Sequence, residues 1–553
     1  MLKNLLKRLA PAAWLVPGFL LWASYPPMGE KTDALFALAP LMWLARNAEP
    51  GRAAKKWFLN GLFFWICTLN WMPAIVKNGG PWPLVVLGWW VLALYCSLYF
   101  AAFGWLSAAV WERVRERSYV WRILALAVAE PVLWAGLEIV RSRLFGGFAW
   151  NQLGVVLSNS GFGAPAAFGG VYLLSAVAVL SNGLVVSVVE RMLAPLPAYR
   201  RIASALSGAP VETEGDFAFR AEVNVPRWVR TLETAVPVAM VAALYFAAAA
   251  DRDARLNSDA SEGGRVVSFA LVQRNFPCAF SAADEKPEMV YAKMAKGFKA
   301  LKPDVMVLPE SAFSEIGPLD KSRAVWFAGW LMSLCGADAV IGGGSRTAAG
   351  NLYNSAALYS RDFTPQYYDK VHLVPFGEYI PGDKVWKWLQ RFAPVGSCTP
   401  GELKTLEWNG VKIGMAICFE DTDSAQMRKL ADAGADLLVM VTNDSWFGGS
   451  VEAEQHAWQS VARAAETGLP VVRVGNSGVT GVVGRDGTAF WLRDSGGALA
   501  VDSQGSMFQR VRIPEGGPKT VYVRLGDVPL LSAFAALLAL LAAAAWKSAK
   551  SRA

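Results

Sequence analysis

Histidine and cysteine are scarce in this chain of 553 residues, which has 2 histidines and 6 cysteines. The two histidines, His372 and His456, are too few for a His-rich metal site, and we expect neither a metal nor another cofactor. The cysteines fit no zinc-binding spacing and no disulfide-rich framework: Cys67, Cys96, Cys278, Cys335, Cys398 and Cys418. The sequence leaves open whether any of Cys278, Cys335 and Cys398 pair.

Charged residues are missing from long stretches of the first half. Only 18% of all residues are charged and 54% are hydrophobic, and the run Phe145–Val189 has no charge at all. Such runs argue against an ordinary soluble protein and predict membrane spans, whereas the segment from about Arg265 to Asp527 has an ordinary globular composition. The net charge of +8 does not indicate a nucleic-acid partner, because the basic residues cluster between apolar runs rather than on one face.

Uncharged runs of bilayer-spanning length predict an α-helical membrane bundle of about eight spans. One apolar span contains Glu130 and Glu138, which are either functional or paired with groups such as Arg141. The segment Phe148–Gly163 is expected to be re-entrant or interfacial. The expected spans are Leu9–Tyr25, Ala34–Ala45, Trp57–Val76, Pro81–Trp111, Ile123–Ile139, Ala166–Val189, Thr234–Ala250 and Val528–Trp546.

The basic residues beside these spans predict an orientation. The connections on one side, together with both termini, hold 20 Lys and Arg residues, and the short loops on the other side hold 4. Under the positive-inside rule both termini are cytoplasmic. We therefore expect a seven-span bundle in residues 1–250, a catalytic domain outside the cytoplasm in 251–527, and an eighth span with a cytoplasmic tail in 528–553.

The globular segment alternates β-type apolar runs with helical stretches, which predicts an α/β layered domain. The expected helices are Pro287–Ala300, Ser322–Leu334, Ser424–Ala433 and Glu452–Thr467. The expected strands are Val266–Val272, Val305–Leu308, Ala339–Gly342, Ala356–Tyr359, Val411–Ile417, Leu437–Thr442, Pro470–Val474 and Val479–Val483.

Cys418 ends one of these strands, shortly before the expected helix start at Ser424. A strand-to-helix corner exposes a side chain and leaves backbone amides, including that of Phe419, to hold an oxyanion. A thiol at such a corner is a candidate nucleophile. The alternative is a buried structural cysteine, which is a common fate of this residue type.

Glu310 and Lys370 are the candidate partners of this thiol. Glu310 also follows a strand and is suited to act as general base, although a solvated surface carboxylate is the competing interpretation. Lys370 is suited to stabilise an oxyanion, although by itself it would be read as a surface charge. His372, two residues further on, is the alternative partner for a cysteine.

Four strings of residues resemble the nitrilase superfamily and, more narrowly, its membrane branch, the apolipoprotein N-acyltransferases. The layout of spans around the globular segment is similar too, and the resemblance implies a nitrilase-like α-β-β-α sandwich. The strings are Leu308-Pro309-Glu310, the run from Tyr368 through Lys370 and Glu378 to Pro381, Ala416-Ile417-Cys418-Phe419-Glu420, and Thr442-Asn443-Asp444-Ser445-Trp446-Phe447-Gly448.

The resemblance implies a catalytic triad of Glu310, Lys370 and Cys418. It implies that Glu378 and Glu420 orient the lysine or an incoming amine, with a loop-packing ion pair as the alternative for Glu420. It also implies that Trp446 and Phe447 shape an acyl pocket, with core packing as the alternative for Trp446. One departure concerns the run after Val272, where the family has a tryptophan and this chain offers Phe276 or Phe280.

The reaction that the resemblance implies has two steps. A membrane phospholipid acylates the cysteine, and the thioester then passes the fatty acyl chain to the α-amine of a diacylglyceryl-modified N-terminal cysteine of an apolipoprotein. It implies a bacterial inner-membrane enzyme whose catalytic domain faces the periplasm, and we expect a monomer. The alternatives are a membrane-tethered amidase that hydrolyses a small amide and a non-catalytic membrane scaffold.

The segment Asp383–Phe392 has a helical pattern with apolar positions on one side and basic residues on the others. Trp386 and Trp388 are aromatic anchors of the kind found at a bilayer interface, so we expect this segment to help bind lipid as a lid. A helix packed on the domain core is the alternative.

Overall fold

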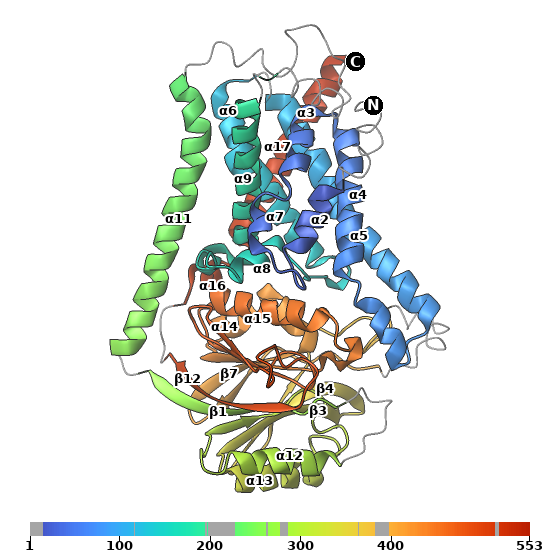
Figure 1. Ribbon diagram of the computed structural model, residues 1–553, viewed down its shortest axis with the longest axis vertical. Coiled ribbons are helices and arrows are strands. Elements are labelled where there is room, and N and C mark those ends of the chain that lie inside the picture. Colours follow the sequence, from blue (N-terminus) through green and yellow to red (C-terminus); the bar gives the residue numbers. More distant parts are fainter. Residues whose placement is uncertain are drawn as a thin grey trace. The chain divides into compact units, whose positions relative to one another are not determined.

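The computed structural model describes residues 15–114, 117–193, 196, 227–261, 264–276, 286–362, 364–381, 397–514 and 519–552. The chain divides into two compact units (Figure 1). The first, a helical unit, contains Met1–Asn70, Gly88–Ala249 and Asp527–Ala553; the second, an α/β unit, contains Trp71–Leu87 and Ala250–Gly526. The second unit thus includes a short segment from the apolar first half. The division into three domains by membrane location stays a prediction.

The membrane-spanning candidates lie mainly in the helical unit. Among the described residues, six helices are long and apolar enough to cross a bilayer: Pro50–Asn78, Trp82–Val114, Tyr119–Arg141, Ala166–Leu193, Thr231–Asn257 and Val528–Ser551. They correspond to six of the eight expected spans. The corresponding elements in Figure 1 are α4 (Pro50–Thr68), η2 (Met72–Asn78), α5 (Trp82–Val114), α6 (Tyr119–Leu124), η3 (Ala125–Ala129), α7 (Glu130–Arg141), α9 (Ala166–Leu193), α11 (Arg227–Ser261) and α17 (Val528–Arg552).

The expected span Ala34–Ala45 is wrong. The chain there forms a 3₁₀ helix, η1 (Lys31–Leu35), and then α3 (Ala39–Asn47). Nine residues rise about 14 Å in an α-helix, less than half of the ~30 Å hydrocarbon core. The expected span Leu9–Tyr25 lies partly outside the described residues, and the helix found in its remainder, α2 (Val16–Ala23), is equally short.

The two intramembrane glutamates have partners within the helical unit. The Glu130 carboxylate accepts a hydrogen bond from Ser107 Oγ at 2.7 Å and lies 3.9 Å from the Arg46 guanidinium. Glu138 Oε1 accepts from the amide of Leu153 at 2.9 Å, at the start of α8 (Leu153–Ser158). The short helix α8 occupies the segment expected to be re-entrant, so Glu138 anchors it by satisfying a terminal N–H group.

The α/β unit is built on two six-stranded sheets. One has the order β12-β1-β2-β3-β4-β5 and the other β11-β10-β9-β8-β7-β6. The strands of the first are β1 (Arg265–Gln273), β2 (Val305–Val307), β3 (Ala339–Ala348), β4 (Asn351–Ser360), β5 (Gln366–Asp369) and β12 (Gly505–Ile513). Those of the second are β6 (Thr405–Trp408), β7 (Val411–Ile417), β8 (Leu437–Thr442), β9 (Val471–Gly475), β10 (Gly481–Val483) and β11 (Ala489–Trp491).

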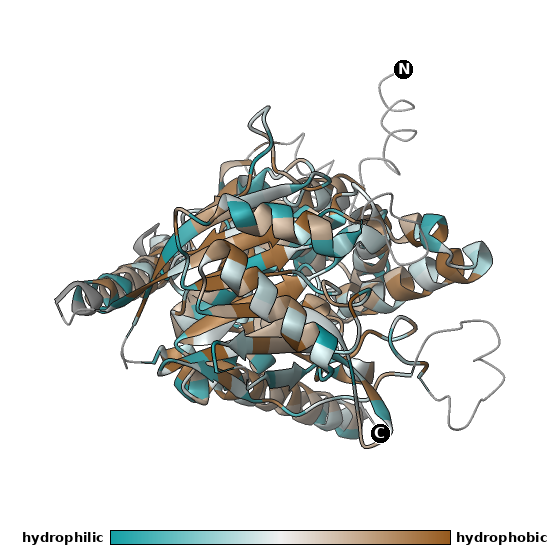
Figure 2. Ribbon diagram, turned by 90° about the horizontal axis from the view of Figure 1, so that it is seen from below, coloured by the Kyte–Doolittle hydropathy of each residue, from teal (hydrophilic) through white to brown (hydrophobic). Residues whose placement is uncertain are grey.

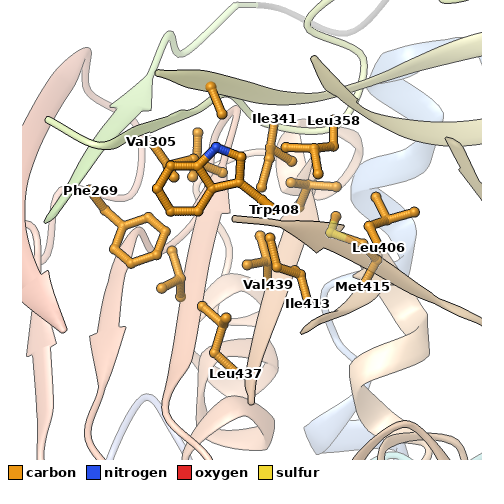
Figure 3. Close-up of a cluster of buried hydrophobic side chains, with 14 of the residues drawn as sticks. Phe269, Val305, Ile341, Leu358, Leu406, Trp408, Ile413, Met415, Leu437 and Val439 are labelled. Atoms are coloured by element: carbon orange, nitrogen blue, oxygen red, sulfur yellow. The ribbon is translucent and has the colours of Figure 1, made fainter. Parts of the chain in front are cut away.

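Successive residues of a strand face opposite sides of its sheet, and in these strands both sets are mostly apolar. Each sheet is therefore hydrophobic on both faces. Phe269, Val305 and Val439 point into the core between the two sheets, which Figure 3 shows with Trp408 lying among aliphatic side chains. The neighbouring residues Ala270 and Met306 belong instead to the layer between the first sheet and its helices. The continuous apolar runs in the sequence follow from burial on both faces.

Two helices cover each sheet, so the unit is the expected α-β-β-α sandwich. The helices α12 (Pro287–Gly297) and α13 (Ser322–Cys335) pack on the first sheet, and α14 (Ser424–Asp432) and α15 (Glu452–Thr467) pack on the second (Figure 1). In Figure 2 the helices carry both hydrophilic and hydrophobic residues, as amphipathic helices on a core do. The short helix α16 (Val521–Leu525) contacts α14 and α15.

Candidate functional site

Cys418 lies at a strained corner directly after β7. Its backbone adopts a left-handed conformation with φ = +53°, and it opens the 3₁₀ helix η6 (Cys418–Thr422). This conformation costs about 1–2 kcal/mol for a residue other than glycine. The preceding residue, Ile417, is fully buried, whereas Cys418 is partly exposed.

Glu310 follows β2 and lies next to a glycine of the adjacent strand. A Cβ on Gly343 would lie only 2.7 Å from the Cα of Glu310, so only glycine permits this close approach. The amide of Gly343 donates to Pro309 O at 3.0 Å and fixes the turn. The Glu310 residue is 8% exposed and accepts a hydrogen bond from Asn354 Nδ2 at 2.8 Å.

Lys370 follows β5 and is 1% exposed. Its ammonium donates to Glu378 Oε1 at 2.9 Å. Asn354 Nδ2 donates to the same oxygen at 2.6 Å, so one amide group bridges Glu310 and Glu378. Sequence reasoning missed Asn354, because nothing in its neighbourhood on β4 distinguishes it from other polar strand residues.

The charges of these residues act on one another. Burial raises the pKa of the Cys418 thiol well above its usual range, the Glu310 carboxylate raises it further, and Lys370 opposes both. Burial likewise raises the pKa of Glu310, against the influence of Lys370. Burial alone would lower the pKa of Lys370, but the carboxylate of Glu378 and the neighbouring groups Cys418 and Glu310 outweigh it, and the net pKa is raised. The resting site thus holds a neutral thiol, a fixed cation and a carboxylate of increased basicity.

Glu420 connects the cysteine corner to the lysine segment. Its fully buried carboxylate accepts from the amides of Val371 at 2.7 Å and Ile417 at 2.8 Å. The hydroxyl of Tyr368 and the amide group of Gln426 also donate to it, at 3.0 and 2.8 Å. These contacts favour an orienting role through the backbone on both sides of the site over the alternative of a loop-packing ion pair.

Phe419 and His372 lie together beside the corner. Their rings meet edge to face with centroids 5.5 Å apart. His372 Nδ1 lies 3.7 Å from Asp423, whose carboxylate also caps α14 by accepting from the amide of Ala425. The ring of His372 therefore contacts Phe419 and lies near Asp423, and the choice of Lys370 as the partner of Cys418 stays a prediction.

Trp446 and Phe447 belong to a pocket loop, defined here as the 3₁₀ helix η7 (Asp444–Phe447), which follows β8. Trp446 is 37% exposed. The ring of Phe447 meets the ring of Trp71 edge to face at 4.7 Å, and Asn78 Nδ2 donates to the carbonyls of Trp446 at 2.7 Å and Ser445 at 3.1 Å. The 3₁₀ helix η2 and Trp71 before it therefore hold this loop.

Trp71 and Asn78 are residues that sequence reasoning missed. Trp71 Nε1 also donates to Gln455 Oε1 at 3.2 Å, across 384 positions of sequence. Trp71 lies near the end of the expected span Trp57–Val76 and Asn78 lies just after it, where a tryptophan and an asparagine are ordinary residues. No local pattern could have linked them to the pocket loop.

The side chain of Asn476 fixes the residues that follow β1. The amide of Phe276 donates to Asn476 Oδ1 at 3.1 Å, and Asn476 Nδ2 donates to Phe276 O and to Asn443 Oδ1, both at 2.9 Å. Phe276 therefore lies next to the strand end that carries the pocket loop. The other expected lipid or entrance contacts, Trp386, Trp388 and Phe280, lie outside the described residues.

One group of buried side chains has the composition of a metal site. Ligand atoms of Asp444, Glu452 and His456 lie within 4.8 Å of one another. His456, however, contacts the carboxylates of Asp421 at 2.9 Å and Asp444 at 3.0 Å, and Arg473 lies 2.5 Å from Asp421. Protein cations already neutralise these carboxylates, which leaves little attraction for a metal ion.

Comparison with known proteins gives two family matches. The Apolipoprotein N-acyltransferase N-terminal domain matches residues 17–184, and the Carbon-nitrogen hydrolase domain matches residues 269–524. The apolipoprotein N-acyltransferase of Geobacter metallireducens is 29% identical over 534 residues, covering 93% of this chain and 91% of that protein. The chain belongs to the apolipoprotein N-acyltransferases.

Further known proteins are similar to this chain. The apolipoprotein N-acyltransferase of Ralstonia nicotianae is 28% identical over 520 residues, covering 92% of this chain and 88% of that protein. Among solved structures, XC1258 of Xanthomonas campestris, a CN-hydrolase superfamily protein, is 18% identical, covers 48% of this chain and 96% of its own, and has a TM-score of 0.34. As a member of its family, this N-acyltransferase is a multi-pass membrane enzyme with a nitrilase-like domain.

Proposed function

We propose that this N-acyltransferase moves a fatty acyl chain from a membrane phospholipid, through a thioester on Cys418, to the α-amine of the diacylglyceryl-modified N-terminal cysteine of an apolipoprotein. The observation that carries the proposal is a partly exposed thiol that shares one charge cluster with Glu310 and Lys370. These are the groups that acyl transfer requires, namely a nucleophile, a base and an oxyanion-stabilising cation.

In the first step, Glu310 takes the proton of the Cys418 thiol as Sγ attacks the carbonyl carbon of the phospholipid ester. The Lys370 ammonium stabilises the negative charge on the carbonyl oxygen of the tetrahedral intermediate. The C–O bond to the glycerol then breaks, and Glu310 returns the proton to the leaving alkoxide. The products of this step are an acylated Cys418 and a lysophospholipid.

In the second step, the α-amine of the apolipoprotein attacks the thioester carbonyl carbon. Glu310 accepts a proton from the amine, the C–S bond breaks, and the proton returns to the Cys418 sulfur. An amide forms and the free thiol is restored, so the two substrates react in turn at one site. The raised pKa of Glu310, which follows mainly from burial, suits a group that takes and returns a proton.

Glu378 and Glu420 position this machinery rather than react. Glu378 holds the Lys370 ammonium at 2.9 Å, which keeps the cation charged and in place. Glu420 ties the backbone on both sides of the site. Trp446 and Phe447 offer aromatic surface for an acyl chain, and Trp386 and Trp388 are proposed to anchor a lipid-facing lid.

The same proposal includes a location. The excess of basic residues beside the spans supports cytoplasmic termini and a catalytic domain facing the periplasm from the bacterial inner membrane. A phospholipid donor and a lipid-anchored acceptor are both held in the membrane, which gives the apolar helices a purpose that an amidase acting on a small soluble amide lacks. The enzyme is proposed to act as a monomer.

Product analysis tests the proposal against hydrolysis of a small amide. Purified enzyme is incubated with a phospholipid and a lipidated N-terminal cysteine peptide, and the products are separated by mass spectrometry. We expect an amide-linked fatty acid on the peptide and an equal amount of lysophospholipid, with neither in the Cys418→Ala variant. Release of free fatty acid or ammonia without acylated peptide would rule the proposal out.

A further inference from the structure

The helix α15 carries a buried charged residue that the mechanism above does not use. His456 is 1% exposed and lies directly behind the cysteine corner. Its Nε2 lies 3.3 Å from the carbonyl oxygen of Cys418 and 2.9 Å from Asp421 Oδ1. Its Nδ1 lies 3.0 Å from Asp444 Oδ1, the first residue of the pocket loop.

Both ring nitrogens of His456 therefore face oxygen atoms that only accept hydrogen bonds. The partners on the Nε2 side belong to η6, three residues apart on the segment that begins with the nucleophile. The partner on the Nδ1 side, Asp444, also accepts from Thr442 Oγ1 at 2.7 Å at the end of β8. A ring that donates from both nitrogens joins the nucleophile corner to the pocket loop.

We propose that His456 is a positioning residue of the acyl transfer, whose ring holds the Cys418 carbonyl on one side and the pocket loop on the other. The inference rests on the proposed function only for the name of the reaction. The corner needs such support, because a left-handed residue other than glycine persists only where its surroundings fix it. Glu420 fixes the corner through the amide of Ile417, and His456 fixes it through the carbonyl of Cys418.

The charges around the ring are consistent with an imidazolium. Asp421 on η6 and Asp444 on η7 face it as anions, and Arg473 on β9 lies beside both. Burial and Arg473 lower the pKa of His456, but the two aspartates outweigh them and raise it to about 10. Burial and the nearby Asp444 raise the pKa of Glu452 well above its usual range, so that carboxyl is neutral. With both nitrogens donating, the ring has no lone pair with which to take the thiol proton, and it acts only through position.

Two substitutions separate the two contacts. The amide nitrogen of glutamine reaches about as far as Nε2 and that of asparagine about as far as Nδ1, so His456→Gln retains the contact with the Cys418 carbonyl and His456→Asn retains the contact with Asp444. We expect His456→Asn to slow acylation of Cys418 by ~100-fold, the scale of a misplaced reacting group. We expect His456→Gln to retain more of this rate and to raise KM for the phospholipid several-fold.

Thr467→Val is the matched control on the same helix. It removes the hydrogen bond that Thr467 Oγ1 donates to Arg463 O at 2.7 Å and the one it accepts from the amide of Leu469 at 3.2 Å, and neither bond includes an atom of η6 or η7. We expect a lower Tm with unchanged acylation kinetics. Equal kinetic losses in both His456 variants, or losses that simply follow Tm across all three variants, would overturn the proposal. The same variants are also compared by the rate at which iodoacetamide alkylates Cys418, a reaction that needs no acyl donor. This comparison tests the positioning role of His456 even if phospholipid is not the substrate.

A spectroscopic measurement on the unmodified ring completes the test. The chain has 2 histidines, so selective ¹⁵N-histidine labelling gives two ring systems, and the His372→Gln variant assigns them. At pH 8 we expect His456 to show two ring N–H groups and nitrogen shifts of an imidazolium, while its Asp421 and Asp444 partners stay ionised. A neutral ring with one N–H at that pH would overturn the proposal whatever the variants do.

Discussion

The thiol of Cys418 is neutral in the resting enzyme because of the residues that surround it. Burial is the largest cause of its raised pKa, and Glu310 adds to it, while Lys370 acts in the opposite direction. A thiol of this kind differs from cysteines that exist as thiolates at neutral pH. We therefore propose that at neutral pH its attack on an acyl donor requires a base to remove the proton, whereas alkylation at alkaline pH proceeds through the thiolate that the rising pH forms.

Alkylation of Cys418 as a function of pH tests this electrostatic account. We expect its reaction with iodoacetamide, followed on the Cys418 peptide by mass spectrometry, to keep accelerating as pH rises through 9. Glu310→Gln removes a charge that raises the thiol pKa, so at a fixed alkaline pH this variant is expected to react faster. Lys370→Met removes a charge that lowers it and is expected to react more slowly. A plateau below pH 8 in the native enzyme would contradict the account.

Glu420 gives a second prediction at the level of one side chain. All its contacts donate to the carboxylate, so the NH₂ group of a glutamine must face a donor wherever it points. We expect Glu420→Gln to lower stability by about 1–3 kcal/mol and to reduce the acylation rate strongly. Tyr368→Phe, which removes a single donor, is the control, with a smaller loss of both. Native stability and rate in Glu420→Gln would mean that the buried network does not organise the site.

At the scale of elements, the segment η2 and the pocket loop form one structure. The Trp71–Phe447 ring contact and the two hydrogen bonds of Asn78 join a connection between apolar helices to the loop that carries Trp446. The first residue of the loop, Asp444, is held separately by His456 and Arg473, whereas these contacts hold its end. We propose that the connection thereby contributes to the shape of an acyl pocket.

Removing the Asn78 contacts is expected to affect binding more than chemistry. In Asn78→Ala, two carbonyls of the pocket loop lose their donor, and we expect KM for the phospholipid to rise about 5- to 10-fold, the effect of 1–1.4 kcal/mol, with a smaller change in kcat. The matched control is Lys77→Ala, because Lys77 is the exposed neighbour in the same 3₁₀ helix. A rise of the same size in Lys77→Ala would show that the effect is not specific to the loop.

The elements that were predicted from sequence are those with long, strong patterns. All eight expected strands and all four expected helices of the α/β unit are confirmed, since each carries a buried apolar run. Three short edge strands, β5, β6 and β11, were not predicted, because 3–4 residues give no period. The strand β12 was missed although Val511 and Ile513 alternate with Arg510 and Arg512, a signal that was readable.

The residues of the site likewise divide into those that were predicted from sequence and those that were not. The strand ends before Cys418 and Glu310 were accessible from sequence, because strand ends follow from apolar runs. The strand β5 before Lys370 was not predicted, and Lys370 was assigned through the family resemblance. The contacts that support these residues were not accessible. Asn354 lies 24 positions from Glu378 and Trp71 lies 384 positions from Gln455, and a hydrogen bond between residues so far apart leaves no local pattern. The roles assigned to the catalytic residues remain predictions until the variants are measured.

At the scale of the whole molecule, the count of spans and the orientation are linked. Six of the eight expected spans have candidate helices among the described residues, Ala34–Ala45 does not, and Leu9–Tyr25 lies partly outside those residues. One span more or fewer before the catalytic segment reverses the side on which that segment lies relative to the N-terminus. The orientation therefore stays a prediction from the basic residues beside the spans.

Reporter fusions test the orientation. We expect a reporter that is active only in the cytoplasm to be active when fused after Ala553 and inactive when fused after Asn409, a residue in the exposed β6–β7 turn. A periplasmic reporter is expected to give the reverse pattern. Cytoplasmic activity at Asn409 would place Cys418 on the wrong side for acylating exported lipoproteins.

The central claim is that Cys418 carries the acyl chain between donor and acceptor. The most direct measurement is mass spectrometry of the intact enzyme after incubation with phospholipid in the absence of acceptor, followed by peptide mapping. The account predicts one added acyl chain, located on Cys418, absent from Cys418→Ala and removed by an amine acceptor. No adduct, or an adduct on a residue other than Cys418 that the acceptor discharges, would contradict it.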